Sequence, residues 1–348
     1  MRRLITVMTL LGLAATLEPL QASEATEPQA CHAIESAAER LSCYDRATGR
    51  PAIDTAPLAG SRPALRRDPL PPRGEVSAPG RSAMVEHWEL DDASDGGLLQ
   101  VRPHQPVYAL PARYTTRRNP LPSSPAPDRS VEDRLNLDSV EAKFQLSLKT
   151  KALDNILGQD LDLWFGYTQL SSWQAYNGIE SSPFRENNYR PEAFLTWGPG
   201  LDLFGGWRWQ MLNLGIVHES NGRDQPRSRS WNRVYARFGL ERGNLAIYAR
   251  PWWRIEESAG DDDNPDIERF LGSHDLHVVW RRGEHDFGLL TRYSFRGERG
   301  GLQADWHFPL IGQLKGYVQL TSGYGETLID YNHKQTTIGV GVSMVEAR

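Results

Sequence analysis

The chain has 348 residues, with 39 basic and 44 acidic side chains and a formal net charge of −5 at pH 7. That length suits one large β domain or two ordinary domains, and the net negative charge gives no reason to expect a nucleic-acid partner. The mean hydropathy is −0.54, and beyond the N-terminus no apolar run reaches the roughly 18 residues that a membrane helix needs. A membrane barrel remains possible, because its alternating strands average out as polar.

The first residues have the layout of a secretory signal peptide. Arg2 and Arg3 precede the apolar segment 4–17, and small residues follow at 22–25. Charged, apolar and small-residue regions occur in this order in such peptides. We therefore expect residues 1–23 to be a signal peptide, cleaved between Ala22 and Ala25, and the mature chain to be exported.

Residues 24–48 contain the two cysteines of the chain, Cys31 and Cys43. An even count in an exported protein favours one disulfide over two free thiols. Between the cysteines, apolar residues recur at helical spacing at Ile34, Ala37, Ala38 and Leu41. The segment is predicted to be a short helix held by a disulfide.

Residues 49–100 are expected to be a linker, because much of the segment is rich in Pro, Gly, Arg and Ala and lacks apolar periodicity. Its PLPP sequence is compatible with a polyproline-binding partner, although a plain spacer is the favoured interpretation. The helix and linker together could also form a periplasmic interaction module, for which the sequence names no partner.

Residues 101–348 change to short alternating segments separated by Gly, Asn, Asp and Pro. In 337–344, for example, apolar residues alternate with small ones. Segments of about 9 to 13 residues are longer than the strands of a soluble sandwich and suit tilted membrane strands. We predict strands near 104–116, 140–150, 161–173, 188–198, 206–220, 230–241, 244–256, 267–281, 284–295, 298–309, 313–324 and 335–345.

Twelve is an even number, as in bacterial single-chain barrels. Connections alternate between tight ones such as 242–243 and long polar ones such as 260–266, which matches periplasmic turns and external loops. The fold class is therefore predicted to be an all-β, twelve-stranded antiparallel transmembrane β-barrel with an N-terminal exported extension. The terminal VEAR lacks the aromatic residue common at the end of such barrels.

The segment 212–220, LNLGIVHES, places two reactive side chains on an apolar strand face. His218 and Ser220 share the parity of the apolar residues Leu212, Leu214 and Ile216, so all five point to one side. In a barrel that side faces lipid. The opposite, lumen-like face is expected to carry Trp209, Met211, Asn213, Gly215 and Glu219.

Asn232 opens the next predicted strand with the same outward parity. Side chains at i and i+2 lie about 7 Å apart, so His218 can reach the Ser220 hydroxyl while Asn232 accepts a hydrogen bond from the other imidazole nitrogen. The alternative is that all three are solvated residues at the edge of a loop.

Three longer motifs add context: HESNGRDQPRSRSWNRVY at 218–235, SSPFRENNYRP at 181–191 and GYGETLIDYN at 323–332. With them the chain resembles the outer membrane phospholipase A family from about Val107 to the last strand. The resemblance implies Ser220 as nucleophile, His218 as general base and then acid, and Asn232 as the residue that orients His218.

The same resemblance implies Ca²⁺ near the oxyanion. Its ligands would be the carbonyls of Arg223 and Ser228 with the Ser181 hydroxyl from a second protomer, and Asp263 matches a further calcium-linked acid. Asp261 and Asp262 are expected to be solvated. Gln225 stands where the family often has an acid, with Asp224 one place earlier, which puts calcium affinity or a second calcium site in question.

The implied activity is calcium-dependent hydrolysis of phospholipid and lysophospholipid acyl esters in the outer membrane, by a homodimer. Gln169 matches a polar residue of the family's dimer interface, although a polar residue on a strand needs no such role. The alternative function is that of a structural or channel barrel that has lost catalysis.

Overall fold

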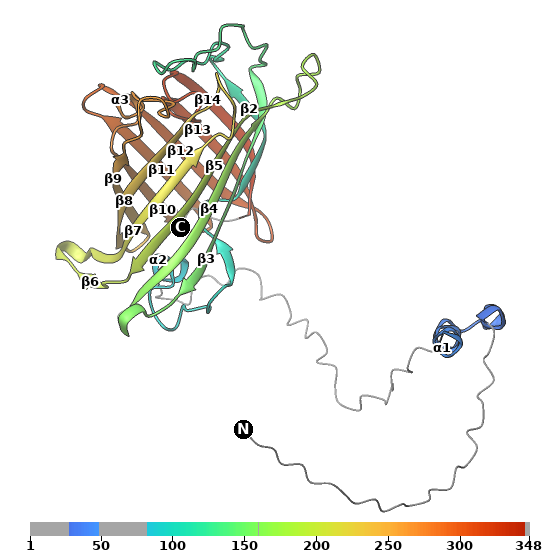
Figure 1. Ribbon diagram of the computed structural model, residues 1–348. Coiled ribbons are helices and arrows are strands. Elements are labelled where there is room, and N and C mark those ends of the chain that lie inside the picture. Colours follow the sequence, from blue (N-terminus) through green and yellow to red (C-terminus); the bar gives the residue numbers. More distant parts are fainter. Residues whose placement is uncertain (1–27, 49–81, 159, 345–348) are drawn as a thin grey trace, which may run out of the picture. The chain divides into compact units, whose positions relative to one another are not determined.

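The computed structural model describes residues 28–48, 82–158 and 160–344 (Figure 1). The chain divides into two compact units, Met1–Pro69 and Leu70–Arg348, and we treat each by itself. The expected signal peptide and most of the expected linker lie outside the described residues. Within the described part, no helix is long and apolar enough to cross a bilayer.

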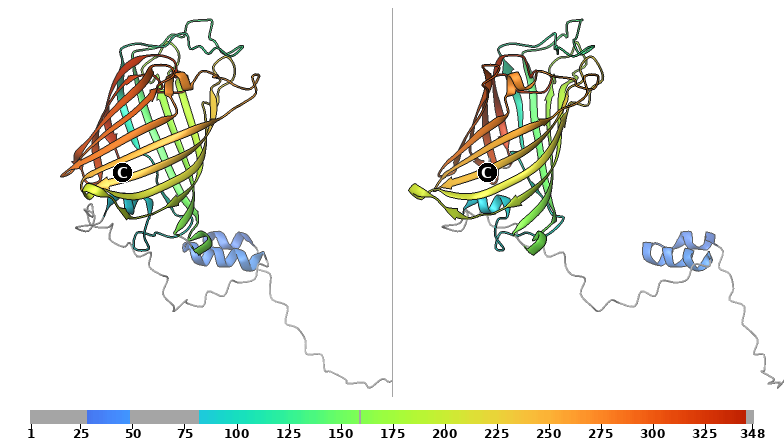
Figure 2. Two further views of the ribbon diagram at one scale, coloured as in Figure 1. Left: turned by 90° about the vertical axis from the view of Figure 1, so that its left-hand side faces the viewer. Right: turned by 60° about the vertical axis from the view of Figure 1, so that its left-hand side comes forward.

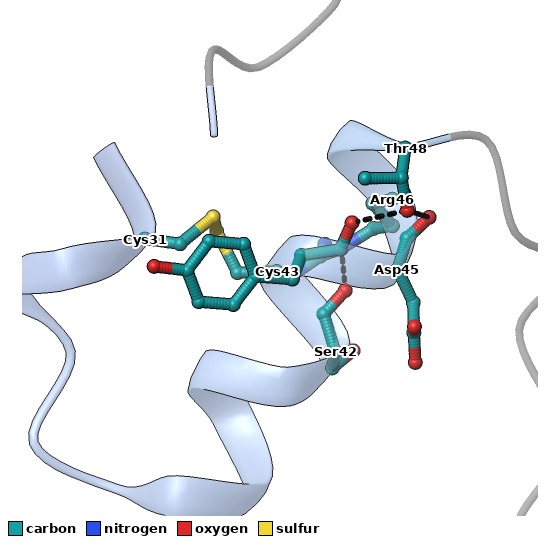
Figure 3. Close-up of a disulfide and its surroundings, with 7 residues drawn as sticks. Cys31, Ser42, Cys43, Asp45, Arg46 and Thr48 are labelled. Atoms are coloured by element: carbon teal, nitrogen blue, oxygen red, sulfur yellow. Dashed lines mark hydrogen bonds between the residues drawn. A yellow bond between two sulfur atoms is a disulfide. The ribbon is translucent and has the colours of Figure 1, made fainter. Parts of the chain in front are cut away.

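The N-terminal unit consists of the 3-10 helix η1 (Pro28–Ala33) and the α-helix α1 (Ala37–Ala47). Cys31 and Cys43 join them in the predicted disulfide, with Cα atoms 5.6 Å apart (Figure 3). Both cysteines are buried while most of their neighbours are exposed. Such a small pair of helices buries little apolar surface, so the covalent bond is its main constraint.

Twelve long antiparallel strands close into a barrel, as predicted (Figures 1 and 2). Closure comes from β2, which pairs with both β3 and β14. The strands are β2 (Tyr108–Thr115), β3 (Val140–Leu153), β4 (Leu161–Trp173), β5 (Phe184–Trp197), β7 (Arg208–Ser220), β8 (Ser230–Arg242), β9 (Leu245–Ile255), β10 (His274–Arg282), β11 (His285–Ser294), β12 (Arg299–Ile311), β13 (Leu314–Gly323) and β14 (Gln335–Ser343).

Short elements account for the differences from the predicted strand limits. The first predicted strand, 104–116, is represented by β2, and a separate short strand, β1 (Val101–Pro103), precedes it and pairs with β3. The expected start of the strand at 267 is instead the helix α3 (Glu268–Leu271). The 3-10 helices η2 (Ile156–Gly158) and η3 (Phe204–Gly206) and the short strand β6 (Leu201–Asp202) lie in connections.

Residues 82–100, expected as the end of the linker, are part of the folded unit. The helix α2 (Ala83–Trp88) begins after Ser82, whose hydroxyl accepts from the amide of Val85 at 3.2 Å. Met84 and Trp88 are buried in the same apolar cluster as barrel residues, and Lys149 of β3 lies 4.0 Å from the Trp88 ring centre. Its six residues are too few to show a helical period in the sequence, and they bury only two large side chains.

The barrel has a polar interior and an apolar exterior. Inside, charged groups pair with one another, as Arg113 does with Glu141 at 2.6 Å and Lys143 with Glu326 at 3.0 Å. Outside, large apolar side chains stay exposed along the strands. This alternation is that of a barrel in lipid.

Candidate active site

The register of β7 and β8 brings the predicted catalytic residues together. His218 lies directly opposite Asn232, and Ser220 lies opposite Ser230. Glu219, on the inner face between the two, accepts a hydrogen bond from Trp231 Nε1 at 3.1 Å and pairs with Arg233. These inner contacts hold the ladder in the register that aligns the outer residues.

The outer face of β7 is apolar, as its parity predicted. Leu214 and Ile216 are 50% and 51% exposed, while Met211 and Asn213 are buried inside. His218 therefore continues an apolar stripe, at the end where β7 enters a loop. A polar group on that stripe is costly unless it lies near the interface or has a function.

One residue of this strand departs from the predicted parity. Trp209, expected to face inward, contacts the outward-facing rings of Trp197 and Phe238. A register shift between Trp209 and Met211 inserts one residue into β7. Such a bulge reverses the alternation on one side of it, so the prediction for Trp209 was wrong and those beyond the bulge were unaffected.

His218 and Asn232 are joined by a hydrogen bond of 2.8 Å between Nδ1 and the amide oxygen Oδ1. An oxygen acceptor at Nδ1 places the imidazole proton there and leaves Nε2 as the free base. Among the described residues, no hydrogen bond links His218 to Ser220. Catalytic hydrogen bonds are often long or poorly aligned without substrate, so the arrangement suits a Ser-His-Asn site in its resting state.

Asn221, the residue after the strand, shapes the loop that leads to β8. Its Oδ1 accepts from the amides of Arg223 and Arg229 at 3.3 and 3.0 Å, and its Nδ2 donates to the carbonyl of Arg227 at 2.8 Å. The loop is thus folded around one side chain. This loop carries Arg223 and Ser228, whose carbonyls are the expected calcium ligands.

Whether this loop can hold Ca²⁺ depends on those two carbonyl oxygens. Carbonyl oxygens are hard ligands suited to Ca²⁺. The Ser228 carbonyl already accepts from the guanidinium of Arg229 at 2.6 Å, but a carbonyl has a second lone pair. Among the described residues, no group of three or more His, Cys, Asp or Glu is placed to hold a metal. The fit therefore depends on carbonyl and hydroxyl oxygens.

Asp263 does not fit a direct calcium ligand. Its carboxylate is buried, pairs with Arg129 Nε at 2.6 Å and accepts from the Ser228 hydroxyl at 2.6 Å. Gln225 directs its amide oxygen toward Arg129 and accepts a hydrogen bond from Arg129 Nη2 at 3.0 Å. A guanidinium thus already neutralises this acid, beside the glutamine that departs from the family pattern.

The remaining predicted residues make contacts of their own. Ser181 is exposed in the β4–β5 connection, with a left-handed φ of 58°. Gln169 faces outward on β4, where its amide forms hydrogen bonds with Tyr167 and Ser171, each at 3.2 Å. Asp261 is exposed as expected, whereas Asp262 pairs with Arg254 at 2.6 Å and was wrongly expected to be solvated.

Sequence reasoning missed three residues that shape the site: Asn221, Arg129 and Glu257. Glu257, in the loop after β9, accepts a hydrogen bond from the Asn232 amide nitrogen at 2.7 Å. Asn221 had a signal, since an Asn-Gly pair directly after a strand marks a structured turn. Arg129 and Glu257 had none, because Arg129 joins two loops that are far apart in sequence, and Glu257 reaches from a loop to Asn232 on β8.

The chain is similar in sequence to known proteins. The family model described as Phospholipase A1 matches residues 84–344. A putative phospholipase A1 of Neisseria meningitidis is 43% identical over 259 residues, which cover 73% of this chain and 68% of that protein. Phospholipase A1 of Escherichia coli is 41% identical over 204 residues, covering 59% and 69%.

Solved structures agree as well. The outer membrane phospholipase dimer of Salmonella typhi with bound calcium has a TM-score of 0.67 and 35% identity, covering 76% of this chain and 98% of that one. Outer membrane phospholipase A from Escherichia coli has the same TM-score and coverage, with 34% identity. The chain therefore belongs to the phospholipase A1 family of β-barrel ester hydrolases.

Proposed function

We propose that this protein hydrolyses the acyl esters of phospholipids and lysophospholipids with a Ser220, His218 and Asn232 site on the lipid-facing side of the barrel. The observation that carries the proposal is the 2.8 Å hydrogen bond between His218 and Asn232 on an otherwise apolar outer face. A phospholipid in the outer leaflet can meet Ser220 there without leaving the membrane.

In this mechanism Ser220 Oγ attacks the ester carbonyl while His218 Nε2 removes the hydroxyl proton. Asn232 holds the Nδ1–H of the ring, so the imidazolium keeps its orientation. His218 then gives the proton to the departing glycerol oxygen, and the acyl chain remains as an ester of Ser220. Water activated by His218 hydrolyses that ester and frees the serine.

We further propose calcium dependence and a dimeric active form. A calcium ion held by the carbonyls of Arg223 and Ser228 and the Ser181 hydroxyl of a second protomer would supply Lewis-acid stabilisation of the oxyanion. The Salmonella typhi relative, solved as a dimer with bound calcium, supports this proposal. Because Asn232 carries no charge to offset the imidazolium, the reaction would depend more on stabilisation of the oxyanion.

The same relatives and the fold support an outer-membrane location. We propose that residues 1–23 direct export and that the barrel resides in the outer membrane. Residues 24–48 would then lie in the periplasm as a disulfide-held helix. The linker proposed to follow it would stop before α2, because that helix belongs to the barrel unit.

The test is fatty-acid release from phosphatidylcholine micelles by the purified, detergent-folded protein. Ser220→Ala is expected to abolish calcium-dependent release while the barrel keeps its heat-modifiable electrophoretic mobility. Undiminished turnover in that variant would refute the catalytic assignment and favour a channel or structural barrel. Hydrolysis that persists in excess chelator would refute the calcium assignment alone.

A further inference from the structure

Glu257 is the one carboxylate that the structure places directly behind Asn232. The loop that carries it starts at Ile255, which pairs with Asn232 across the β8–β9 ladder. Glu257 Oε1 accepts from Asn232 Nδ2 at 2.7 Å. Its other oxygen, Oε2, is buried and has no hydrogen-bond partner among the described residues. The carboxylate therefore makes its side-chain hydrogen bond to Asn232 alone.

This contact decides which way the carboxamide of Asn232 points. An ionised carboxylate can only accept hydrogen bonds, so it selects the orientation in which Nδ2 faces Glu257. The amide oxygen is then left to face His218 Nδ1, 2.8 Å away. A flipped amide would instead donate to Nδ1 and shift the ring proton to Nε2, where it would block acceptance of the serine proton.

We propose that Glu257 is a positioning residue of the esterase site: its carboxylate fixes the Asn232 amide and, through that amide, the tautomer of His218. The inference rests on the Ser-His-Asn site proposed above. The carboxylate also places a negative charge behind an uncharged third member, which favours the imidazolium formed during the reaction and polarises the amide between them.

The charged groups that face Glu257 are Arg254, Asp262 and Asp263. Burial raises the pKa of Glu257 above its ordinary value, and the two aspartates add to the rise, while the hydrogen bond from Asn232 and the charge of Arg254 oppose it. Protonation converts Glu257 into a group that can also donate, which removes its preference for Nδ2. Activity should therefore fall on acidification partly through Glu257.

The experiment compares Glu257→Ala and Glu257→Gln with a matched control, Glu256→Gln. The control removes the same charge from the exposed neighbouring residue. With phosphatidylcholine micelles and saturating calcium, we expect Glu257→Ala to lower kcat by about 10- to 100-fold with little change in KM, by analogy with the loss of a group that orients a metal-bound histidine. Glu257→Gln should recover part of that loss, because its amide oxygen can accept from Asn232, and should lose part of the acid limb of the pH profile. Glu256→Gln should match the wild type.

The imidazole ¹⁵N resonances of His218 give a readout that a merely structural role would not move. The wild type should show the proton on Nδ1, and Glu257→Ala a mixture of tautomers. Ser220→Ala is assayed alongside: if it retains turnover, the proposed function fails. If Ser220→Ala is inactive while both Glu257 variants keep the wild-type kcat, pH profile and tautomer, the role of Glu257 is overturned and the triad stands. If Glu257→Ala does not fold, Glu257→Gln carries the test through its pH profile and tautomer.

Discussion

Replacing Asn232 by Asp asks whether the third member of the site must be an amide. In the wild type the amide accepts from His218 at 2.8 Å and donates to Glu257 at 2.7 Å. An aspartate of the same shape keeps the first contact and replaces the second by an oxygen facing an oxygen. We therefore expect Asn232→Asp to be slower than the wild type, although Asp is the usual residue in such triads.

The size of the effect follows from the distance. Two unit charges held at the 2.7 Å of this contact repel by about 6 kcal/mol at an effective dielectric constant of about 20. This is an upper limit, because the loop can move and increase the separation. Even half of it is about 3 kcal/mol, which makes the pair hold its first proton roughly a hundredfold more tightly and moves the loss of that proton toward neutral pH. The pair then carries little more than the one negative charge that Glu257 already supplies in the wild type, so the aspartate adds little charge at His218.

The assay is kcat for phosphatidylcholine hydrolysis between about pH 6 and 9, where a histidine base titrates. We expect a loss of about tenfold in Asn232→Asp and recovery when Glu257→Gln is added, because the new amide at position 257 can donate to the new carboxylate. The double-mutant cycle should give a coupling of about 1.5 to 3 kcal/mol, the range for a hydrogen bond to a charged group. A fully active Asn232→Asp, with additive effects in the double variant, would refute the reasoning.

Three further outcomes follow from contacts around the site. Asp263→Asn should lower the free energy of unfolding by about 3 kcal/mol, because it leaves the buried guanidinium of Arg129 without a carboxylate; thermal unfolding in detergent measures the loss. The calcium concentration for half-maximal activity should stay the same. A tenfold rise in that concentration would instead identify Asp263 as a calcium ligand. Burial favours a raised pKa for Glu326, but the buried cations Arg113 and Lys143 outweigh burial and hold the pKa below the ordinary value. Its ionised form therefore stabilises the barrel above about pH 4.5, and this stabilisation is lost on acidification. Glu326→Gln should be less stable than the wild type at pH 7, and its stability should depend less on acid. An equal dependence of unfolding on pH in the two proteins would contradict this. Gln169→Leu should weaken the calcium-dependent dimer, measured by cross-linking, without weakening the barrel, and an unchanged dimer would remove Gln169 from the interface.

Strand parity was sufficient to predict the outer location of the site. His218, Ser220 and Asn232 lie in stretches of β7 and β8 that contain no bulge, where a period of two assigns each side chain to one face. The same rule failed at Trp209, because a bulge adds one residue and the sequence carries no mark of it. Parity is therefore reliable only between bulges, and the end of β7 that carries His218 and Ser220 lies within one such stretch.

Loops set the limit for the rest. Asp263 pairs with Arg129, and Asn232 donates to Glu257. The fold brings the members of each pair together from separate parts of the chain. Local sequence patterns hold no information about such contacts. The helix α2 was not predicted for a related reason: its two large buried residues, Met84 and Trp88, pack against barrel residues and form no repeating pattern in the sequence.

The division of roles between Asn232 and Glu257 has a physical reason in the location of the site. Asn232 lies on a strand face shared with exposed apolar side chains such as Val234, where an ionised carboxylate would be costly. A neutral amide can hold the histidine there at lower cost. The charge sits instead in the loop after β9, nearer to water, and reaches His218 through the amide. A serine esterase that works at a lipid surface can in this way keep an acid in its hydrogen-bond chain without burying that acid in the membrane.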